Sequence, residues 1–259
     1  MGSFTKEIKK MGDENRLDIS KLSIREIDRK IAKDMIVKNH YSHRWTKVSV
    51  ALGLFYSDGS GHKFFDEPDE KLIGTICYGD PIGRHSALLY QLRYQERCIR
   101  VSRLFIHDGY GSNIESYLIG KSFKWLKENK PNIKGLISYA DPQEGHVGTI
   151  YQATNWIYQG NRIRPNDSWL FKWEEDGEWQ HGRTIFPYYG TNDVEKLRGL
   201  VPKDFWVKKE LRKHRYVYLL GSKSEIRKAR KGLKHPQLTY PKTSDIEEVE
   251  IKKIEVTNK

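Results

Sequence analysis

The segment between residues 98 and 160 constrains the fold most, because strand and helix signals alternate along it. Strands are expected at residues 98–106, at residues 133–139 and from Trp156 onward. Helices are expected between them, at residues 114–128 and 147–154. Strands joined through a helix crossover run parallel in one sheet. The segment therefore predicts a sheet with a mostly parallel central portion.

Antiparallel strands are expected before this segment. Residues 48–56 alternate between apolar and polar side chains, and residues 72–78 have the pattern of the returning strand. A helix is expected from Ser23 to about Asn39, because Ser23 and Glu26 have the spacing of a capping box. Its buried stripe would consist of Ile24, Ile27, Ile31 and Met35. Together these patterns predict an α/β fold with a mixed central sheet.

The remaining signals suggest the domain organisation. We expect a flexible leader at residues 1–18, one domain at residues 19–242 with a basic lobe at about 200–242, and a mobile tail at residues 243–259. Within the domain, short β segments are expected at 161–190, a last strand at 214–220 and a basic helix at 222–234. No signal peptide or membrane-length apolar run is visible, so a cytoplasmic protein is expected.

The charge is concentrated near the end of the chain. The formal net charge is +12, and twelve Lys or Arg residues stand against three acidic residues between Lys203 and Lys234. Aromatic residues such as Trp206 and Tyr218 are interleaved with them. A solvated helix face is the ordinary explanation of a charge run, but this concentration favours a nucleic-acid partner. Cys77 and Cys98 are far apart in sequence and are expected to be reduced core thiols.

Three local motifs could carry chemistry. The turn at residues 107–113 contains Gly109, Gly111 and Ser112 ahead of a predicted helix, so its backbone N–H groups could approach a phosphate. A plain tight turn is the alternative. Asp141 follows a predicted strand, at the edge where open α/β sheets bind ligands, and Tyr151 lies on the next helix. A helix cap and a packing aromatic are the ordinary alternatives for these two residues.

The third motif is the 40–45 loop, His-Tyr-Ser-His-Arg-Trp. Its hydrogen-bonding groups and aromatic rings would suit a stacked base and its phosphate. His40 and His43 have a spacing that a metal could use, although two histidines without a placed third ligand are a weak metal signal.

Four segments together resemble the phage Mom-type DNA-modification proteins. They are the 40–45 loop, Ser102–Asp108 (SRLFIHD), Ser138–Gly160 (SYADPQEGHVGTIYQATNWIYQG), and the pair KHRYVYLL and YPK near the end. The resemblance spans about residues 30–242. It implies a fold similar to Gcn5-related N-acetyltransferases. It also implies an enzyme that converts adenine in phage DNA to a carbamoylmethylated form and so protects the DNA from restriction.

The resemblance also implies which residues act. The family's Arg, Ser, Asp and Tyr fall on Arg103, Ser116, Asp141 and Tyr151. His40 and Tyr41 form a further implicated pair, with iron binding suggested. Acetyl-CoA or a related acyl donor would be the cofactor, held at Gly109, Gly111 and Ser112.

The resulting expectation is a transferase that acts on the exocyclic N6 of adenine in double-stranded DNA. The base must leave the helical stack, and Asp141 would help to remove a proton. The expected DNA contacts are Arg44, Trp45, Lys213, Arg215, Arg227, Lys228, Arg230 and Lys231. Two alternatives stay open: an N-acetyltransferase acting on a protein, tRNA or small amine, and a non-catalytic nucleic-acid-binding protein. The group transferred, its donor and the oligomeric state are not fixed by the sequence.

Overall fold

The computed structural model describes residues 18–57, 70–81, 89–93, 95–161 and 168–256. The expected leader at 1–18 lies almost wholly outside them. The chain divides into two compact units instead of the single expected domain. The first comprises Met1–Ser138, Thr149–Gln159 and Tyr216–Leu238, and the second comprises Tyr139–Gly148, Gly160–Arg215 and Thr239–Lys259. The basic region at 200–242 is therefore shared between the units and is not one lobe.

The first unit contains most of the sheet and the long helices. Its elements are η1 (Ile19–Lys21), β1 (Leu22–Glu26), α2 (Arg29–Asn39), β2 (Val50–Ser57), β3 (Glu70–Gly79), β4 (Arg97–Ile106), α3 (Ile114–Asn129), β5 (Ile133–Ala140), α4 (Thr149–Ala153), β6 (Ile157–Asn161), β10 (His214–Leu219) and α7 (Lys223–Lys231), with the ends of β5, β6 and β10 reaching into the second unit.

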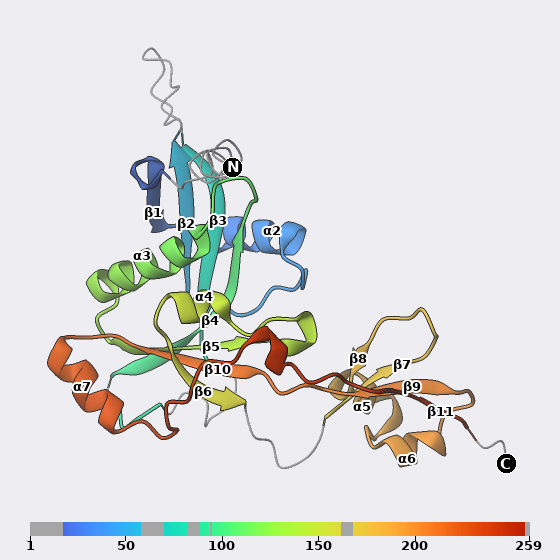
Figure 1. Cartoon of the computed structure of the whole chain (residues 1–259). Coiled ribbons are helices and arrows are strands. Elements are labelled where there is room, and N and C mark those ends of the chain that lie inside the picture. Colours follow the sequence, from blue (N-terminus) through green and yellow to red (C-terminus); the bar gives the residue numbers. More distant parts are fainter. Residues whose placement is uncertain (1–17, 58–69, 82–88, 94, 162–167, 257–259) are drawn as a thin grey trace, which may run out of the picture. The chain divides into compact units, whose positions relative to one another are not determined.

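A seven-stranded sheet forms the centre of the first unit, in the order β1-β2-β3-β4-β5-β10-β6 (Figure 1). Neighbouring strands from β1 to β4 are antiparallel, and β4 and β5 are parallel. Cys77 of β3 packs in a core cluster with Ala32 and Ile36 of α2, whereas the neighbouring Tyr78 bonds to Ser122 of α3. Because successive strand residues point to opposite faces, α2 and α3 cover opposite faces of the sheet. The predicted α/β fold with a mixed sheet is confirmed.

Two irregularities in the central strands position side chains. The parallel ladder of β4 and β5 ends at the pair Arg100 and Ile137, although both strands continue beyond it. On the other side of β4, Cys77 pairs with Arg103 and Tyr78 pairs with Val101, so Ser102 is an extra residue. Such a bulge bends a strand and changes the direction of its side chains. The bulge directly precedes Arg103.

The start of the chain differs from the prediction. Residues 22–26 form β1, paired antiparallel with β2, and the helix α2 begins at Arg29 with Asp28 as its N-cap. Asp28 accepts the Lys30 N–H at 2.6 Å. The predicted stripe was wrong as well, because Ala32 and Ile36 are buried and Ile31 is half exposed. Tertiary pairing of Leu22 and Ile24 with β2 outweighed the local capping pattern.

The second unit has its own sheet and core. Its elements are η2 (Pro142–Glu144), β7 (Trp169–Lys172), β8 (Gln180–His181), α5 (Gly182–Tyr189), α6 (Val194–Arg198), β9 (Phe205–Lys209), η3 (Thr243–Asp245) and β11 (Ile251–Ile254). The sheet order is β11-β9-β7-β8. Phe171, Ile185, Leu197, Phe205 and Val207 are the centre of its core.

Two expectations for this unit need correction. Residues 182–189 are helical, so the 161–190 segment is only partly β. The expected mobile tail contributes β11, which pairs with β9, and the Val256 N–H donates to the Asp204 carboxylate at 2.9 Å. Ile254 packs against the core, which explains why this charged segment is ordered. Among the described residues no helix has the length and apolarity needed to cross a membrane.

Candidate active site

The guanidinium of Arg103 is fixed by backbone carbonyls. Its Nε donates to the Arg44 carbonyl at 2.9 Å, and one terminal nitrogen donates to the Ser102 carbonyl at 2.7 Å. The first bond ties the β4 bulge to the 40–45 loop. Burial lowers the pKa of Arg103, while Tyr41 and Cys77 oppose that shift. No carboxylate of the described residues forms an ion pair with Arg103, so its charge is available to an anion.

The 40–45 loop is held in a defined conformation at the end of α2. The buried His40 caps the helix, and its Nδ1 accepts the Ser42 N–H at 3.1 Å and lies 2.9 Å from the Ser42 hydroxyl. The Tyr41 ring lies 4.2 Å from the His40 ring, centroid to centroid, and is 61% exposed. His43 has a positive φ of 45°, and its Nδ1 lies 2.9 Å from the Val37 carbonyl. The exposed Tyr41 ring is therefore presented on a rigid support.

The donor set at His40 does not fit an iron site. Its Nδ1 is already occupied by Ser42, and Arg103 lies close enough to lower its pKa. A bound cation would meet the same repulsion as the proton. Within the described ranges no three His, Cys, Asp or Glu side chains gather where a metal could be held. No chemical step is therefore assigned to a metal at His40 and Tyr41.

Tyr151 is buried on α4 and retains its proton. Burial raises its pKa, although a hydrogen bond with Ser138 of β5 works against this effect. Its ring packs against Trp156 and Tyr216 at centroid distances of 5.2 and 5.3 Å. The phenol is thus a neutral hydroxyl held in place by aromatic neighbours, which suits a proton donor.

Electrostatic neighbours connect these residues into what we term the Arg103–Tyr151 cluster, comprising His40, Tyr41, Arg103 and Tyr151. Burial is the largest cause of each pKa shift, and a cluster member adds to the shift at His40 and Tyr151 but opposes it at Arg103. Arg103 lowers the pKa of His40, and Tyr41 acts on both Arg103 and Tyr151. Residues from the loop after α2, from β4 and from α4 are therefore linked by electrostatic interactions, and Tyr41 and Tyr151 are more than 100 positions apart in sequence.

The glycine turn precedes α3 in the same unit. Gly109 and Gly111 have φ values of +94° and +100°, and Asn113 has a left-handed backbone as well. A Cβ at Gly109 would meet no atom within 4 Å, so this position is open. Asn113 makes no side-chain cap, and within the described chain the first N–H groups of α3 have no side-chain partner. Open, uncapped N–H groups of this kind fit the phosphates of a coenzyme.

Ser116 lies with the glycine turn and not with the cluster. It occupies the first turn of α3, two residues after Ile114. Among the described residues no side-chain hydrogen bond joins it to Arg103, Tyr151 or the 40–45 loop.

Asp141 belongs to the second unit. It caps η2 by accepting the Gln143 N–H at 3.1 Å, and its other carboxylate oxygen is paired with the Lys213 ammonium. The Asp141 carbonyl also accepts N–H groups of Glu144 and His146, both at 3.1 Å. Both oxygens of the Asp141 carboxylate are therefore held in place by partners.

The expected DNA contacts differ in exposure. Arg227, Lys228, Arg230 and Lys231 are exposed on α7, and none makes an ion pair within the described part of the chain. The α7 helix begins with a capping box formed by Ser222 and Glu225. Arg44 is exposed as well. These residues fit the expected role.

The other three expected DNA contacts are engaged elsewhere. The Lys213 charge is compensated by Asp141, and Arg215 is 7% exposed. Trp45 packs against the core cluster beneath α2. A side chain that is paired or buried cannot also meet phosphate freely, so exposure argues against assigning DNA contacts to these three.

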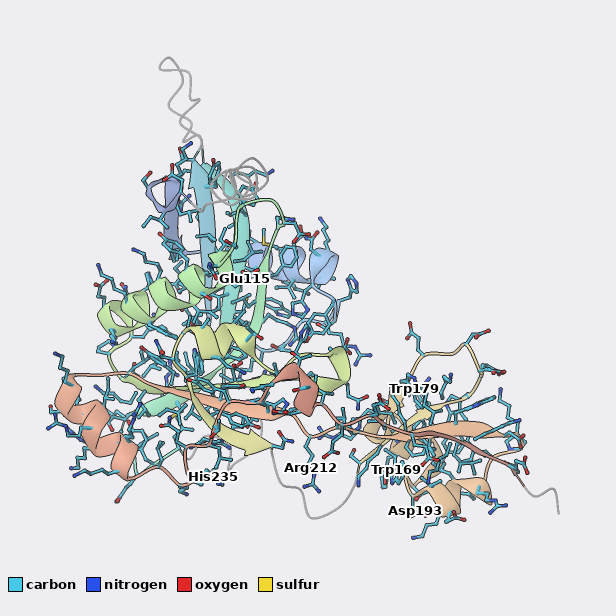
Figure 2. The ribbon with its side chains drawn as sticks, in the orientation of Figure 1. Glu115, Trp169, Trp179, Asp193, Arg212 and His235 are labelled. Atoms are coloured by element: carbon cyan, nitrogen blue, oxygen red, sulfur yellow. The ribbon has the colours of Figure 1, made fainter. Side chains whose placement is uncertain are left out.

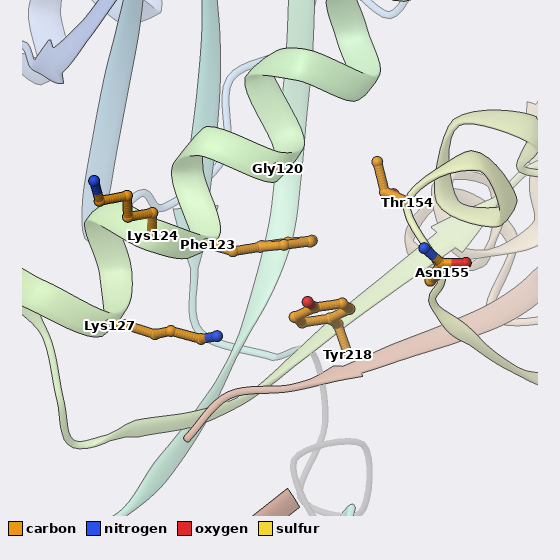
Figure 3. Close-up of a pocket in the computed structure, with 7 residues that line it drawn as sticks. All are labelled: Gly120, Phe123, Lys124, Lys127, Thr154, Asn155 and Tyr218. Carbon is orange, nitrogen blue, oxygen red and sulfur yellow. The ribbon is translucent and has the colours of Figure 1, made fainter. Parts of the chain in front are cut away.

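The first unit has a pocket of about 410 Å³ to which the sequence analysis assigned no role (Figure 3). It is lined by Gly120, Phe123, Lys124, Lys127, Thr154, Asn155 and Tyr218. The Phe123 and Tyr218 rings stack at a centroid distance of 3.8 Å. The pocket shares no residue with the Arg103–Tyr151 cluster.

Residues 21–242 match the model of the Mom protein family. The chain belongs to the Mom protein family. This Mom-family chain is 29% identical over 157 residues to a protein of Escherichia phage Mu named methylcarbamoylase mom. The match covers 60% of this chain and 58% of the phage Mu protein, so it spans less than two thirds of that relative.

Solved structures similar to the Mom-family chain include acetyltransferases. Arabidopsis thaliana NAA60, in complex with acetyl-CoA, is 13% identical, with 77% of this chain and 99% of that chain covered and a TM-score of 0.44. An N-acetyltransferase from Staphylococcus aureus is 13% identical, with 76% and 97% covered and a TM-score of 0.37.

Two supporting features of the Mom-family site were not predicted from the sequence. Ser138 bonds the Tyr151 phenol, and Ser102 forms the bulge beside Arg103. Both residues lie inside the segments that carry the family resemblance, but a hydroxyl in a strand has no local signature. Buried Tyr78 is a third case, because its hydroxyl lies 2.5 Å from Ser122 and donates to it.

His40 should make the stability of this chain depend on pH. Burial, with Arg103 and His43, lowers the pKa of His40 from 6.5 to about 4. The unfolded chain protonates His40 as the pH falls through about 6.5, whereas the folded chain does so only near its lowered pKa. This contribution to stability is therefore complete at neutral pH and is lost as the pH falls toward that value. Between about pH 7 and about pH 4.5, His40 should reduce the free energy of unfolding by about 2 kcal/mol.

Urea unfolding of wild type and His40→Gln at both pH values measures this effect. Glutamine does not titrate, so the variant should lose about 2 kcal/mol less than wild type over the same interval. Equal losses in the two proteins would show that His40 titrates normally.

Proposed function

We propose that this Mom-family chain is a transferase that modifies the N6 amino group of adenine in DNA, in the manner of carbamoylmethylation. The observation that supports it best is the Arg103–Tyr151 cluster, in which a fixed guanidinium and a protonated phenol lie within electrostatic reach of an exposed tyrosine ring. The name of the phage Mu relative, a methylcarbamoylase, points to the same class of reaction. The expected consequence is protection of phage DNA from restriction.

The chemistry assigns a role to each group. The N6 lone pair of adenine is delocalised into the ring, so the amine needs a base as it attacks the donor. We assign this step to the Asp141 carboxylate, which is paired with the Lys213 ammonium. The Arg103 guanidinium would stabilise negative charge that develops on the donor, and the Tyr151 phenol would supply a proton. Tyr41 would stack on the extruded base.

An acyl-coenzyme A or a related donor fits the glycine turn. The backbone N–H groups around Gly109, Gly111 and Ser112 would hold its phosphates, with Ser116 nearby in the first turn of α3. When bound, the donor would supply the carbon that N6 attacks, and the Tyr151 proton would go to the leaving group. A carbamoylmethyl product contains an N–CH2 bond, so the donor would have to transfer a CH2 carbon, because transfer of an acyl carbon would give an amide. The hydrogen-bonded ladder between β4 and β5 ends at Arg100. Backbone groups of the two strands beyond this point would be available to bind the extended part of the donor.

Mass spectrometry of nucleosides tests the proposed function. DNA from cells that express the chain should contain a heavier deoxyadenosine, and the other three deoxynucleosides should be unmodified. The mass difference also identifies the transferred group. Unmodified deoxyadenosine together with an acylated tRNA or protein would contradict the proposal and would favour an N-acetyltransferase with another substrate.

The exposed basic side chains of α7 should supply much of the affinity for DNA. Replacing Arg227, Lys228, Arg230 and Lys231 with Gln should weaken binding to any duplex and flatten the plot of log affinity against log salt. The slope should change by about 0.9 for each phosphate that the variant no longer neutralises. A matched control replaces Arg29, Lys30, Lys33 and Lys38 of α2 with Gln. These four residues are also exposed, and their replacement removes the same charge. Equal slopes for the two quadruple variants would exclude a specific role of α7.

A further inference from the structure

The sheet of the second unit has one face that its own core does not use. Along β9, Phe205 and Val207 point into the core, so Trp206 and Lys208 point to the opposite face. On β7, Phe171 is in the core and Lys172 pairs with Trp206 across the strands. On β11, Lys253 pairs with Trp206 from the other side.

Lysine and tryptophan side chains alternate across this face. The Lys172 ammonium lies 5.1 Å from the centre of the Trp179 ring and 5.7 Å from that of Trp206. The Lys208 ammonium lies 4.5 Å from the Trp179 ring, and Lys253 lies 5.5 Å from the Trp206 ring. We call Trp179, Trp206, Lys172, Lys208 and Lys253 the Trp–Lys face. Two flat rings are thus bordered by three cations.

The other tryptophans of this unit do not share this role. Trp169 and Trp173 pack against the core cluster, whereas Trp179 joins the Trp–Lys face. Figure 2 labels Trp169 and Trp179. The exposed Ile251 pairs with Lys208 and extends the apolar surface beside it. In this unit, different tryptophans therefore form part of the core and part of the surface.

The charge on this face is positive. Lys253 pairs with Asp204 at 3.2 Å, but Lys172 and Lys208 make no ion pair with any described carboxylate. Burial lowers the pKa of Lys208, and Lys172 adds to this shift although Glu144 opposes it. Two ammonium groups over one ring repel each other, so an anion between them would be stabilised.

We propose that the Trp–Lys face binds single-stranded DNA, with bases stacked on Trp179 and Trp206 and phosphates held by Lys172 and Lys208. Aromatic platforms with interleaved cations are how proteins bind unpaired strands without reading sequence. A duplex hides its base faces, so the rings would gain little from it. The inference rests on the proposed function, because an enzyme that extrudes adenine from a duplex leaves bases unpaired.

Fluorescence anisotropy with a labelled 15-nucleotide oligo-dT tests the inference in the full-length protein. Trp179→Leu should weaken oligo-dT binding about tenfold, with less than about a twofold change for a hairpin duplex. The matched control is Trp125→Leu on α3, which removes a ring that also has an ammonium, that of Lys130, 5.9 Å from its centre. That control should bind oligo-dT as wild type does.

Two lysine variants test the same inference without changing a tryptophan. Lys208→Gln should weaken oligo-dT binding severalfold and reduce its salt dependence. Lys252→Gln is the control, because Lys252 pairs with Val207 and thus lies on the core side of the sheet. Equal effects of the two lysine variants would overturn the inference.

Three further results would also overturn it. The first is unchanged oligo-dT binding by a folded Trp179→Leu protein, and the second is an equal loss for oligo-dT and duplex. The third is a wild-type dimer that Trp179→Leu dissolves, because it would show that a second copy occupies the face. Nucleoside mass spectrometry tests the proposed function separately. If deoxyadenosine is unmodified but the protein still prefers oligo-dT to duplex, the proposed enzyme activity is refuted and the binding role of the Trp–Lys face is supported.

Discussion

Asp141→Asn should lower the rate of adenine modification by about 100- to 10 000-fold. An amide cannot accept the N6 proton at neutral pH, whereas a carboxylate can. Asparagine caps helices as well as aspartate does, so the bond to the Gln143 N–H and the fold should persist. Nucleoside mass spectrometry over time measures the rate, and binding of a DNA duplex should be nearly unchanged.

The control for this variant is Asp193→Asn in the same unit. Asp193 is also an N-cap, of α6, and accepts the Lys196 N–H at 3.0 Å. The two substitutions remove the same charge from the same kind of position. A full rate in Asp141→Asn, or an equal loss in both variants, would show that Asp141 has no role in proton transfer.

Tyr151→Phe should reduce the modification rate by a similar factor, about 100-fold or more, while the protein remains folded. The substitution removes the hydroxyl that bonds Ser138 and keeps the ring contacts with Trp156 and Tyr216. The loss should appear in the maximal rate, because the proposed proton transfer belongs to the chemical step. Single-turnover measurements with saturating DNA report this rate directly.

Tyr78→Phe provides the comparison. Tyr78 is fully buried, and its hydroxyl bonds Ser122 on α3. Tyr78 is also an electrostatic neighbour of Tyr151, so the comparison isolates the loss of the reacting hydroxyl from the loss of a nearby one. Loss of the Tyr78 hydroxyl should cost about 1 kcal/mol of stability and slow the reaction far less than Tyr151→Phe does. If both variants slow the reaction equally, Tyr151 contributes to structure and not to proton transfer.

Local sequence patterns predicted the central strands and helices, but they did not predict the strand at the edge of the sheet. The alternation of strands and helices from Cys98 to Trp156 predicted β4, α3, β5, α4 and β6, because each element has its own apolar period. Ser23 and Glu26 also fitted a capping box, yet these residues form an edge strand. A short segment of this kind is decided by its partner strand β2, which no local pattern reveals.

The family resemblance named six candidate site residues, whose roles stay predictions, but it could not give their geometry. The family resemblance pointed to Arg103, Tyr151, His40 and Tyr41, and the structure brings these four into one cluster. The bulge at Ser102 and the Ser138 hydrogen bond depend on strand register, which the sequence does not encode locally. Charge counting predicted DNA contacts at Arg215 and Lys213, but it cannot distinguish a free cation from a buried or paired one.

The position of β10 has a consequence for synthesis of the chain. This strand, His214–Leu219, lies between β5 and β6 in the sheet, although both of those strands precede it by more than 50 residues. Until residue 219 has left the ribosome, β5 and β6 each have an unpaired edge. Open strand edges of apolar sheets promote association with other chains. A nascent or truncated chain that ends before β10 is therefore expected to need a chaperone, and the yield of folded protein should be limited by the time that these edges stay open.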